Sequence, residues 1–251
     1  MEFFMSFSKS LLVAAVLATV SNFALAKDKM VVGTEPTFAP FDFVDDKSNE
    51  IIGFDIDVMK AIGDAVDMDV QMQAMQFDGL IPAVLSHSID AAISGMTKNP
   101  QREKQVLFSD PYYVAAQGMM VRTADLGKFK VMDDLKGKPI CVQIGSVGAN
   151  IAQGIENANV ITYNTMPEAY MELKKGVCDA AITGTPVQQF YLVQTQDKDL
   201  AYVEESAVNA ADLGIITNKS NTALMEKINA GLKTIKDNGT YQKIYDKWFR
   251  Q

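Results

Sequence analysis

Histidine, tryptophan and cysteine are scarce in this chain: its 251 residues include one histidine, one tryptophan and two cysteines. His87 stands alone and no Cys/His spacing suits zinc, so we predict no metal site and no cofactor. The sequence also lacks a Ser-His-Asp set, a cysteine with an activating histidine and a glycine-rich phosphate-binding fingerprint. These absences argue against an enzyme.

Cysteine is too rare for a disulfide framework. Cys141 and Cys178 both lie in apolar segments that are typical of buried strands. We therefore favour two packed thiols. One bridge stays open as the alternative, because an oxidising compartment would permit it.

Basic residues are outnumbered, with 23 Lys and Arg against 31 Asp and Glu and a formal net charge of -8. An acidic surface disfavours nucleic acid and anionic membranes as partners. It does not exclude an anionic ligand, because one arginine in a cleft can outweigh a diffuse field.

Long apolar runs are missing except near the start of the chain. Lys9 precedes the apolar residues 11–20, and Ala24-Leu25-Ala26 follows as a small-residue cleavage site. This pattern predicts a secretory signal peptide over residues 1–26, cut after Ala26. A membrane anchor is the alternative, but spanning takes roughly 20 apolar residues. We expect a mature protein that is exported to the periplasm and soluble.

Apolar periodicity follows the same order of elements twice. Segments that predict strand, helix, strand, helix and strand in turn lie at 30–33, 51–66, 69–75, 77–88 and 89–94, and the order restarts at 139–146, 147–158, 159–164, 166–176 and 178–184. This order predicts parallel α/β sheets and two similar lobes. We place Asp78 near the N-cap at the start of its helix.

The end of the chain predicts two helices. Leu224, Ile228, Leu232 and Ile235 recur at helical spacing, and Asn238-Gly239 breaks the pattern. Thr240 then stands where it could cap a last helix. The apolar stripe of that helix indicates core packing rather than a cofactor site, and its members are Tyr241, Ile244, Tyr245, Trp248 and Phe249.

Two nearly identical phrases, IDAAISGMT at 89–97 and CDAAITGTP at 178–186, end one strand in each predicted lobe. Ligands of parallel sheets bind beyond the carboxyl ends of the strands. Small polar residues with Gly or Pro occupy these ends at 34–38, 94–97, 143–147 and 183–185. We therefore expect the binding site at these four segments.

Arg102, close to Pro100 and seven residues after Gly95, is our candidate for a guanidinium that binds a carboxylate bidentately. Phe38 and Phe77 stand directly beyond strands, where two rings could enclose a side chain. The alternatives are a surface charge for the arginine and ordinary packing for the rings.

Five segments carry a resemblance to a known family: VVGTEPTFAPFDF, IGFDIDVMKAI, FDGLIPAVL, IDAAISGMTKNPQREKQVLFSDPYY and DNGTYQKIYDKWF. In this order they resemble the periplasmic polar amino-acid binding proteins of ABC importers. These family 3 solute-binding proteins include the glutamine-binding and the lysine/arginine/ornithine-binding proteins. The resemblance covers residues 30–250.

The resemblance implies an α/β clamshell of two lobes, each a mostly parallel sheet flanked by helices, joined by two crossover strands. Lobe 1 would comprise 27–112 and 212–251, lobe 2 would comprise 116–208, and the hinges would lie at 113–115 and 209–211. A monomer would hold its ligand between the lobes and dock on a membrane permease when closed.

The resemblance also implies roles for individual residues. Arg102 would bind the α-carboxylate, together with the backbone at Thr97, Ser146 and Val147. The strand end at Ser94 and Gly95 would meet the α-ammonium and carboxylate. Phe38 and Phe77 would form aromatic walls, and Glu35 would face the ligand side chain.

Two positions depart from the family pattern. Gly184, after Thr183, stands where relatives commonly carry an aspartate that pairs with the α-ammonium, and a buried ammonium without a counter-charge is costly. Gln143 stands where relatives carry a lysine or an apolar residue. Glu35 could serve the ammonium instead, a cage of water and carbonyls could replace the acid, or the ligand could lack an ordinary ammonium.

We therefore expect a protein that captures an amino acid, or a close carboxylate analogue, and delivers it to an ABC transporter permease. A lyase similar to cyclohexadienyl dehydratase is an alternative, with Glu35 as its acid or base. A sensory module that signals through a separate partner is another. The ligand stays open: a free Glu35 suits a cationic side chain, whereas a Glu35 that serves the ammonium suits a neutral one.

Overall fold

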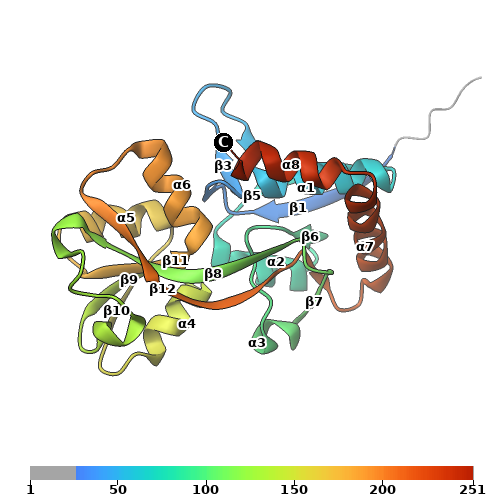
Figure 1. The fold of residues 1–251 in the computed structure, drawn as a ribbon. Coiled ribbons are helices and arrows are strands. Elements are labelled where there is room, and N and C mark those ends of the chain that lie inside the picture. Colours follow the sequence, from blue (N-terminus) through green and yellow to red (C-terminus); the bar gives the residue numbers. More distant parts are fainter. Residues whose placement is uncertain (1–26, 251) are drawn as a thin grey trace, which may run out of the picture.

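The computed structural model describes residues 27–250, so the predicted signal peptide lies outside the described residues. Two α/β lobes lie side by side, each with a five-stranded sheet flanked by helices (Figure 1). The predicted clamshell architecture is thereby confirmed. Within the described part of the chain, no helix combines the length and apolar character needed to cross a membrane.

The sheet of the first lobe has the order β5-β1-β6-β13-β7, in which β1 is parallel to β5 and β6, and β13 is antiparallel to β6 and β7. Its strands are β1 (Asp28–Thr34), β5 (Met68–Ala74), β6 (Ala91–Ala92), β7 (Val106–Phe108) and β13 (Ile216–Asn218). The helices of this lobe are α1 (Phe54–Ala65), α2 (Leu80–Leu85), α3 (Pro100–Glu103), α7 (Thr222–Asp237) and α8 (Thr240–Phe249). A small antiparallel sheet is added by β2 (Thr37–Phe38), β3 (Asp42–Val44) and β4 (Ile51–Ile52).

The sheet of the second lobe has the order β10-β9-β11-β8-β12. Its strands are β8 (Tyr113–Arg122), β9 (Pro139–Gln143), β10 (Asn159–Tyr163), β11 (Ala180–Gly184) and β12 (Leu200–Leu213), and its helices are α4 (Val147–Gly154), α5 (Met166–Lys174) and α6 (Thr185–Thr195). The strands β8 and β12 pair antiparallel and run from this sheet toward the first lobe (Figure 1). Both predicted hinges lie on these two strands, and the exact lobe boundaries stay predictions.

Several expected elements differ in detail. The helix expected at 51–66 begins only at Phe54, because Gly53 has φ 141° and a Cβ there would lie 2.1 Å from the carbonyl oxygen of Phe41. The helix expected at 77–88 is a 3₁₀ turn, Phe77–Gly79, followed by α2, and Asp78 lies in the first turn, near the N-cap Gln76, as expected. The expected cap at Thr240 is wrong. Gly239, at φ 79°, precedes α8 and Thr240 is its first residue.

The C-terminal stripe packs into the core, as expected. Phe249 of α8 lies 5.1 Å from the ring of Phe54 and 5.7 Å from that of Phe41, measured between ring centroids. Trp248 is buried, and its Nε1 donates a hydrogen bond of 2.8 Å to the carboxylate of Asp57 on α1. These contacts fix α8 against α1 in the first lobe.

Cys141 and Cys178 form a disulfide, so the favoured expectation of two packed thiols is wrong. The parallel strands β9 and β11 are neighbours in the sheet, and Cys178 comes just before β11. The two Cα atoms are therefore 5.8 Å apart, a separation that a disulfide spans. Residues 37 positions apart in the sequence meet only through this strand pairing.

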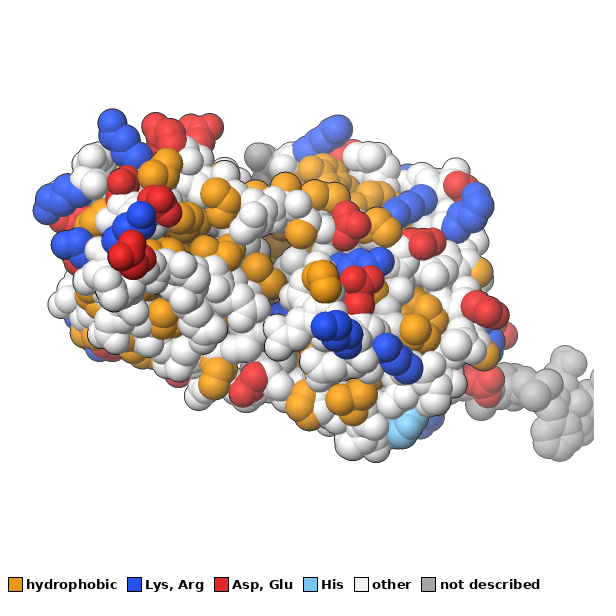
Figure 2. Space-filling model, turned by 90° about the horizontal axis from the view of Figure 1, so that it is seen from below, with side chains coloured by type: hydrophobic (Ala, Val, Ile, Leu, Met, Phe, Trp, Pro, Cys, Tyr) orange, Lys and Arg blue, Asp and Glu red, His pale blue; other side chains and the backbone are white. Residues whose placement is uncertain are grey.

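Charged side chains of both signs are intermixed on the face shown in Figure 2. The excess of acid is therefore not gathered into a single patch on that face.

Candidate functional site

Strand ends from both sheets meet at a narrow cavity of about 20 Å³. The first lobe lines it with Phe38, Phe77, Gly95, Thr97 and Arg102, and the second lobe lines it with Gln117, Gln143, Ser146, Val147 and Thr183. The predicted site residues therefore come together, except that Glu35, Ser94 and Gly184 lie behind the lining. Gln117 is the residue that sequence reasoning missed.

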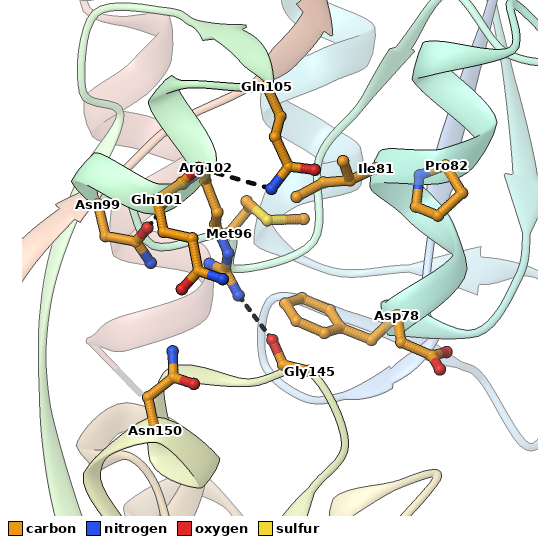
Figure 3. A pocket seen from close by; sticks show the side chains of 11 residues that line it. Asp78, Ile81, Pro82, Met96, Asn99, Gln101, Arg102, Gln105, Gly145 and Asn150 are labelled. Atoms are coloured by element: carbon orange, nitrogen blue, oxygen red, sulfur yellow. Dashed lines mark hydrogen bonds between the residues drawn. The ribbon is translucent and has the colours of Figure 1, made fainter. Parts of the chain in front are cut away.

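Arg102 is only 6% exposed and lies on the short helix α3, whose N-cap Asn99 accepts a hydrogen bond from the Arg102 N–H. Its Nη1 donates to the carbonyl oxygen of Thr97 at 2.7 Å, and its Nη2 donates to that of Gly145 in the other lobe at 3.0 Å (Figure 3). Its guanidinium also lies over the Phe77 ring, 5.4 Å from the centroid.

Burial lowers the pKa of Arg102 to about 10, so the side chain stays cationic at neutral pH. Among residues 27–250, no carboxylate forms an ion pair with it, and both named partners are neutral carbonyls. A buried cation that lacks a counter-charge favours an anion, and a guanidinium binds a carboxylate with two parallel hydrogen bonds.

A second cavity of about 300 Å³ lies beside the narrow one, and Phe77 and Arg102 line both. Amide side chains from two segments, the region of α3 and the helix α4, surround it: Asn99, Gln101, Gln105 and Asn150 (Figure 3). The hydrogen bond between Arg102 and Gly145 crosses from one lobe to the other at this point.

Ser146 and Val147, at the start of α4, line the narrow cavity. Ser146 is the N-cap, and its Oγ accepts a hydrogen bond of 3.0 Å from the N–H of Ala149. The first N–H groups of a helix lack partners within the helix and carry partial positive charge. The start of α4 therefore adds a second feature that favours a negative group beside Arg102.

Glu35 is buried and holds hydrogen bonds on both carboxylate oxygens. Oε1 accepts from the hydroxyl of Thr37 at 2.6 Å, and Oε2 accepts from Nε2 of Gln143 in the other lobe at 3.0 Å. Burial raises the pKa of Glu35 above its ordinary value, and these two hydrogen bonds oppose the shift. Gln143 also donates to the carbonyl oxygen of Asn164 at 3.0 Å.

Gly95 supports one wall of the cavity. Its φ is 52°, and a Cβ there would lie 2.9 Å from Cε1 of Phe38, so the Phe38 ring rests directly on the glycine. Ser94 points away from the cavity lining: its Oγ donates to Asp42 at 2.6 Å and accepts from the Glu35 N–H at 3.1 Å.

Gly184 shows no crowding that demands a glycine. A Cβ there would lie 3.9 Å from both Phe38 and Pro186, which is ordinary contact. Gln117 of β8 pairs in register with Gly184 and is nearly buried in the cavity wall. A polar residue within the apolar run YVAAQGMMV was the one sequence signal for Gln117, because the pairing of β8 with β11 cannot be read from the chain.

Comparison with known proteins agrees with this geometry. The family profile described as bacterial extracellular solute-binding proteins, family 3, matches residues 30–251. The ABC transporter arginine-binding protein 1 of Escherichia coli (strain K12) is 35% identical over 246 residues, which is 97% of this chain and 100% of the relative.

Solved structures show the same likeness. An ancestral arginine-binding protein bound to arginine is 39% identical, with a TM-score of 0.83 over 89% of this chain and 99% of that chain. An ancestral amino acid-binding protein described as a precursor of cyclohexadienyl dehydratase is 34% identical, with a TM-score of 0.81 over 88% of this chain and 95% of that chain. The chain therefore belongs to family 3 of the bacterial extracellular solute-binding proteins.

Proposed function

We propose that this solute-binding protein captures arginine between its two lobes and delivers it to an ABC transporter permease. The observation that carries amino-acid capture is Arg102, a buried guanidinium with neutral partners at the junction of the lobes. Arginine in particular is supported by the names of the relatives and by the buried Glu35 carboxylate close to the same junction.

Capture requires the lobes to separate first. The narrow cavity of about 20 Å³ is far smaller than an amino acid, and two hydrogen bonds join the lobes across it, Arg102 to Gly145 and Gln143 to Glu35. The α-carboxylate would take the place of the Gly145 carbonyl between Arg102 and the start of α4. Contacts to both lobes at once give the ligand its greater affinity for the closed form, as a population shift requires.

The guanidinium of the ligand would reach Glu35. It would replace the hydrogen bonds from Thr37 and Gln143 with a charge-assisted ion pair. The α-ammonium would then use strand-end carbonyls and the amide oxygen of Gln117, since Gly184 supplies no acid. This division of roles accounts for a site in which Glu35 faces the second lobe and Gly184 stands where an aspartate was expected.

Export through a signal peptide over residues 1–26 and action as a monomer complete the proposal. The family description as extracellular proteins and the ABC transporter relatives support the location and the permease partner. A lyase has less support, because the family description and the name of the relative are those of binding proteins.

Isothermal titration of refolded, ligand-free protein tests the proposal. Arginine should bind tightly. Agmatine, which is arginine without the α-carboxylate, should bind about 100-fold more weakly, and citrulline, which lacks the side-chain charge, should also bind more weakly. Glutamine, cystine and prephenate complete the panel. Absence of arginine binding, or equal affinity for agmatine, would contradict the proposal.

A further inference from the structure

Two fully buried carboxylates lie directly beneath the strand ends of the binding site. Asp42 belongs to β3 and Asp55 to the first turn of α1, and both are 0% exposed. The titratable groups that act on them are Glu35 and Tyr112, with Tyr241 of α8 near Asp55. None of these groups is a cation.

Each acid holds part of the cavity wall. Oδ2 of Asp42 accepts hydrogen bonds from the hydroxyls of Thr34 and Ser94, the latter at 2.6 Å. Oδ2 of Asp55 accepts from the N–H of Gly95 at 2.7 Å and from the hydroxyl of Tyr112 at 2.9 Å. Both carboxylates thus bind Ser94-Gly95, the bend just after β6 that carries part of the cavity lining.

The second oxygen of each carboxylate makes no hydrogen bond. Oδ1 of Asp42 and Oδ1 of Asp55 are buried and have no hydrogen-bond partner. The two carboxylates accept from adjacent residues, Ser94 and Gly95, and two anions buried so near each other are costly, so the pair holds a proton. Burial raises the pKa of Asp55 to about 7, and burial followed by the charge of Asp55 raises the pKa of Asp42 well above its ordinary value.

We propose that Asp42 and Asp55 are positioning residues that keep at least one proton between them at neutral pH and thereby hold Ser94, the Gly95 N–H and the Phe38 ring in the geometry that binds ligand. The proton would reside on an Oδ1 atom that now lacks a partner, while the Oδ2 atoms stay free to accept. Because Phe38 rests on Gly95, the acid pair acts on the ligand through the backbone and does not touch it.

Proton release on unfolding measures the retained proton without any ligand. We would obtain it from the pH dependence of the unfolding constant in urea, for the wild type and for Asp42→Asn/Asp55→Asn. The wild type should release about one proton more than the double variant at pH 8 and about two more at pH 5.5, because unfolded aspartate is ionised at both values. At pH 8 the wild type should also release about one proton more than the single variant Asp42→Asn.

The Gly95 amide reports the positioning directly. Its ¹H–¹⁵N resonance should titrate near pH 7 in the wild type, and this titration should disappear in Asp55→Asn. Asp64→Asn, at the exposed end of the same helix, is the matched control and should keep both the titration and the proton release. Equal proton release in the wild type and the double variant at pH 8 would overturn the proposal. A Gly95 chemical shift that does not change with pH would overturn it as well.

Ligand affinity provides the last comparison, which rests on the proposed function. Asp55→Ala should bind arginine about tenfold or more weakly, and Asp55→Asn, which retains an acceptor for the Gly95 N–H, should recover most of this loss. A cooperatively folded Asp55→Ala with wild-type affinity would exclude a positioning role. If wild-type protein binds no amino acid, the proposed function fails, whereas proton release and the Gly95 resonance still decide this proposal.

Discussion

The surroundings of Arg102 suit it to bind a carboxylate. Its buried guanidinium donates hydrogen bonds to two backbone carbonyls, and a ligand carboxylate can replace one of these carbonyls. We expect Arg102→Ala to weaken arginine binding about 100-fold or more, since it removes two charged hydrogen bonds. Arg102→Lys should recover only part of this loss because lysine lacks the planar fork. Titration calorimetry with arginine and agmatine measures both variants. Agmatine affinity should change little, and an equal loss for both ligands would contradict the carboxylate assignment.

Glu35 should also contribute to the pH dependence of the unfolding free energy. Its folded-state pKa is raised by burial above the unfolded value, so its contribution is fully present at pH values below the unfolded pKa and is lost as the pH rises through the folded pKa. Removing the charge in Glu35→Gln should therefore flatten the decline of the unfolding free energy above about pH 4.5. Urea unfolding from pH 4 to 7 measures this, and identical pH profiles for the two proteins would refute it.

Gly95 at the end of β6 combines an unfavourable φ with a close neighbour. Gly95→Ala should destabilise the protein by about 1 kcal/mol and also displace the Phe38 ring, so that arginine affinity falls. Gly127→Ala is the matched control, since Gly127 has φ 89° but nothing within 4 Å of a new Cβ. It should lose stability and keep its affinity. Equal affinities for the two variants, measured by calorimetry, would mean that contact with Phe38 is unimportant.

The disulfide joins the β9 and β11 region of the second lobe across 37 residues. Replacing both cysteines with alanine should lower the free energy of unfolding by about 4 kcal/mol, through the freedom that the unfolded chain regains. Urea unfolding measures the loss, and a thiol assay under denaturing conditions should find no free thiol in the untreated protein. A full complement of free thiols would show that the bridge does not form.

Closure of the whole molecule involves apolar contacts outside the cavity. The ring of Phe43 on β3 of the first lobe lies 6.1 Å from that of Phe190 on α6 of the second, measured between centroids. Phe190→Ala should weaken arginine binding about threefold to tenfold, since such aromatic pairs contribute about 0.5 to 1.5 kcal/mol. Val193→Ala, 70% exposed on the same helix, is the control. Calorimetry and small-angle X-ray scattering should show weaker binding and a more open average shape for Phe190→Ala only.

Most of the fold could be predicted because its determinants are local. The helices α5 and α7 begin at caps that the chain itself supplies, Thr165 with Glu168 and Asn221. Two errors occurred where a distant contact decides. Gly53 separates β4 from α1 because the Phe41 carbonyl lies against it, and the two cysteines meet because β9 and β11 pair.

The candidate site divides in the same way. Arg102, Phe38, Phe77 and Gly95 stand out because an arginine, aromatic rings and a glycine at strand ends already indicate recognition of a small ligand. Gln117 could not be recognised from the chain, since its place in the cavity wall depends on the antiparallel pairing of β8 with β11.

By itself, the sequence determined the repeated strand and helix order, the family and most of the strand-end residues near the site, because periodicity and motif order are properties of neighbouring residues. The tertiary structure alone decided which groups exchange hydrogen bonds. It joined Glu35 to Gln143 across the lobes and placed Asp42 and Asp55 beneath Ser94 and Gly95. Burial and charge pairing depend on segments far apart in the chain, and only the packed structure brings those together.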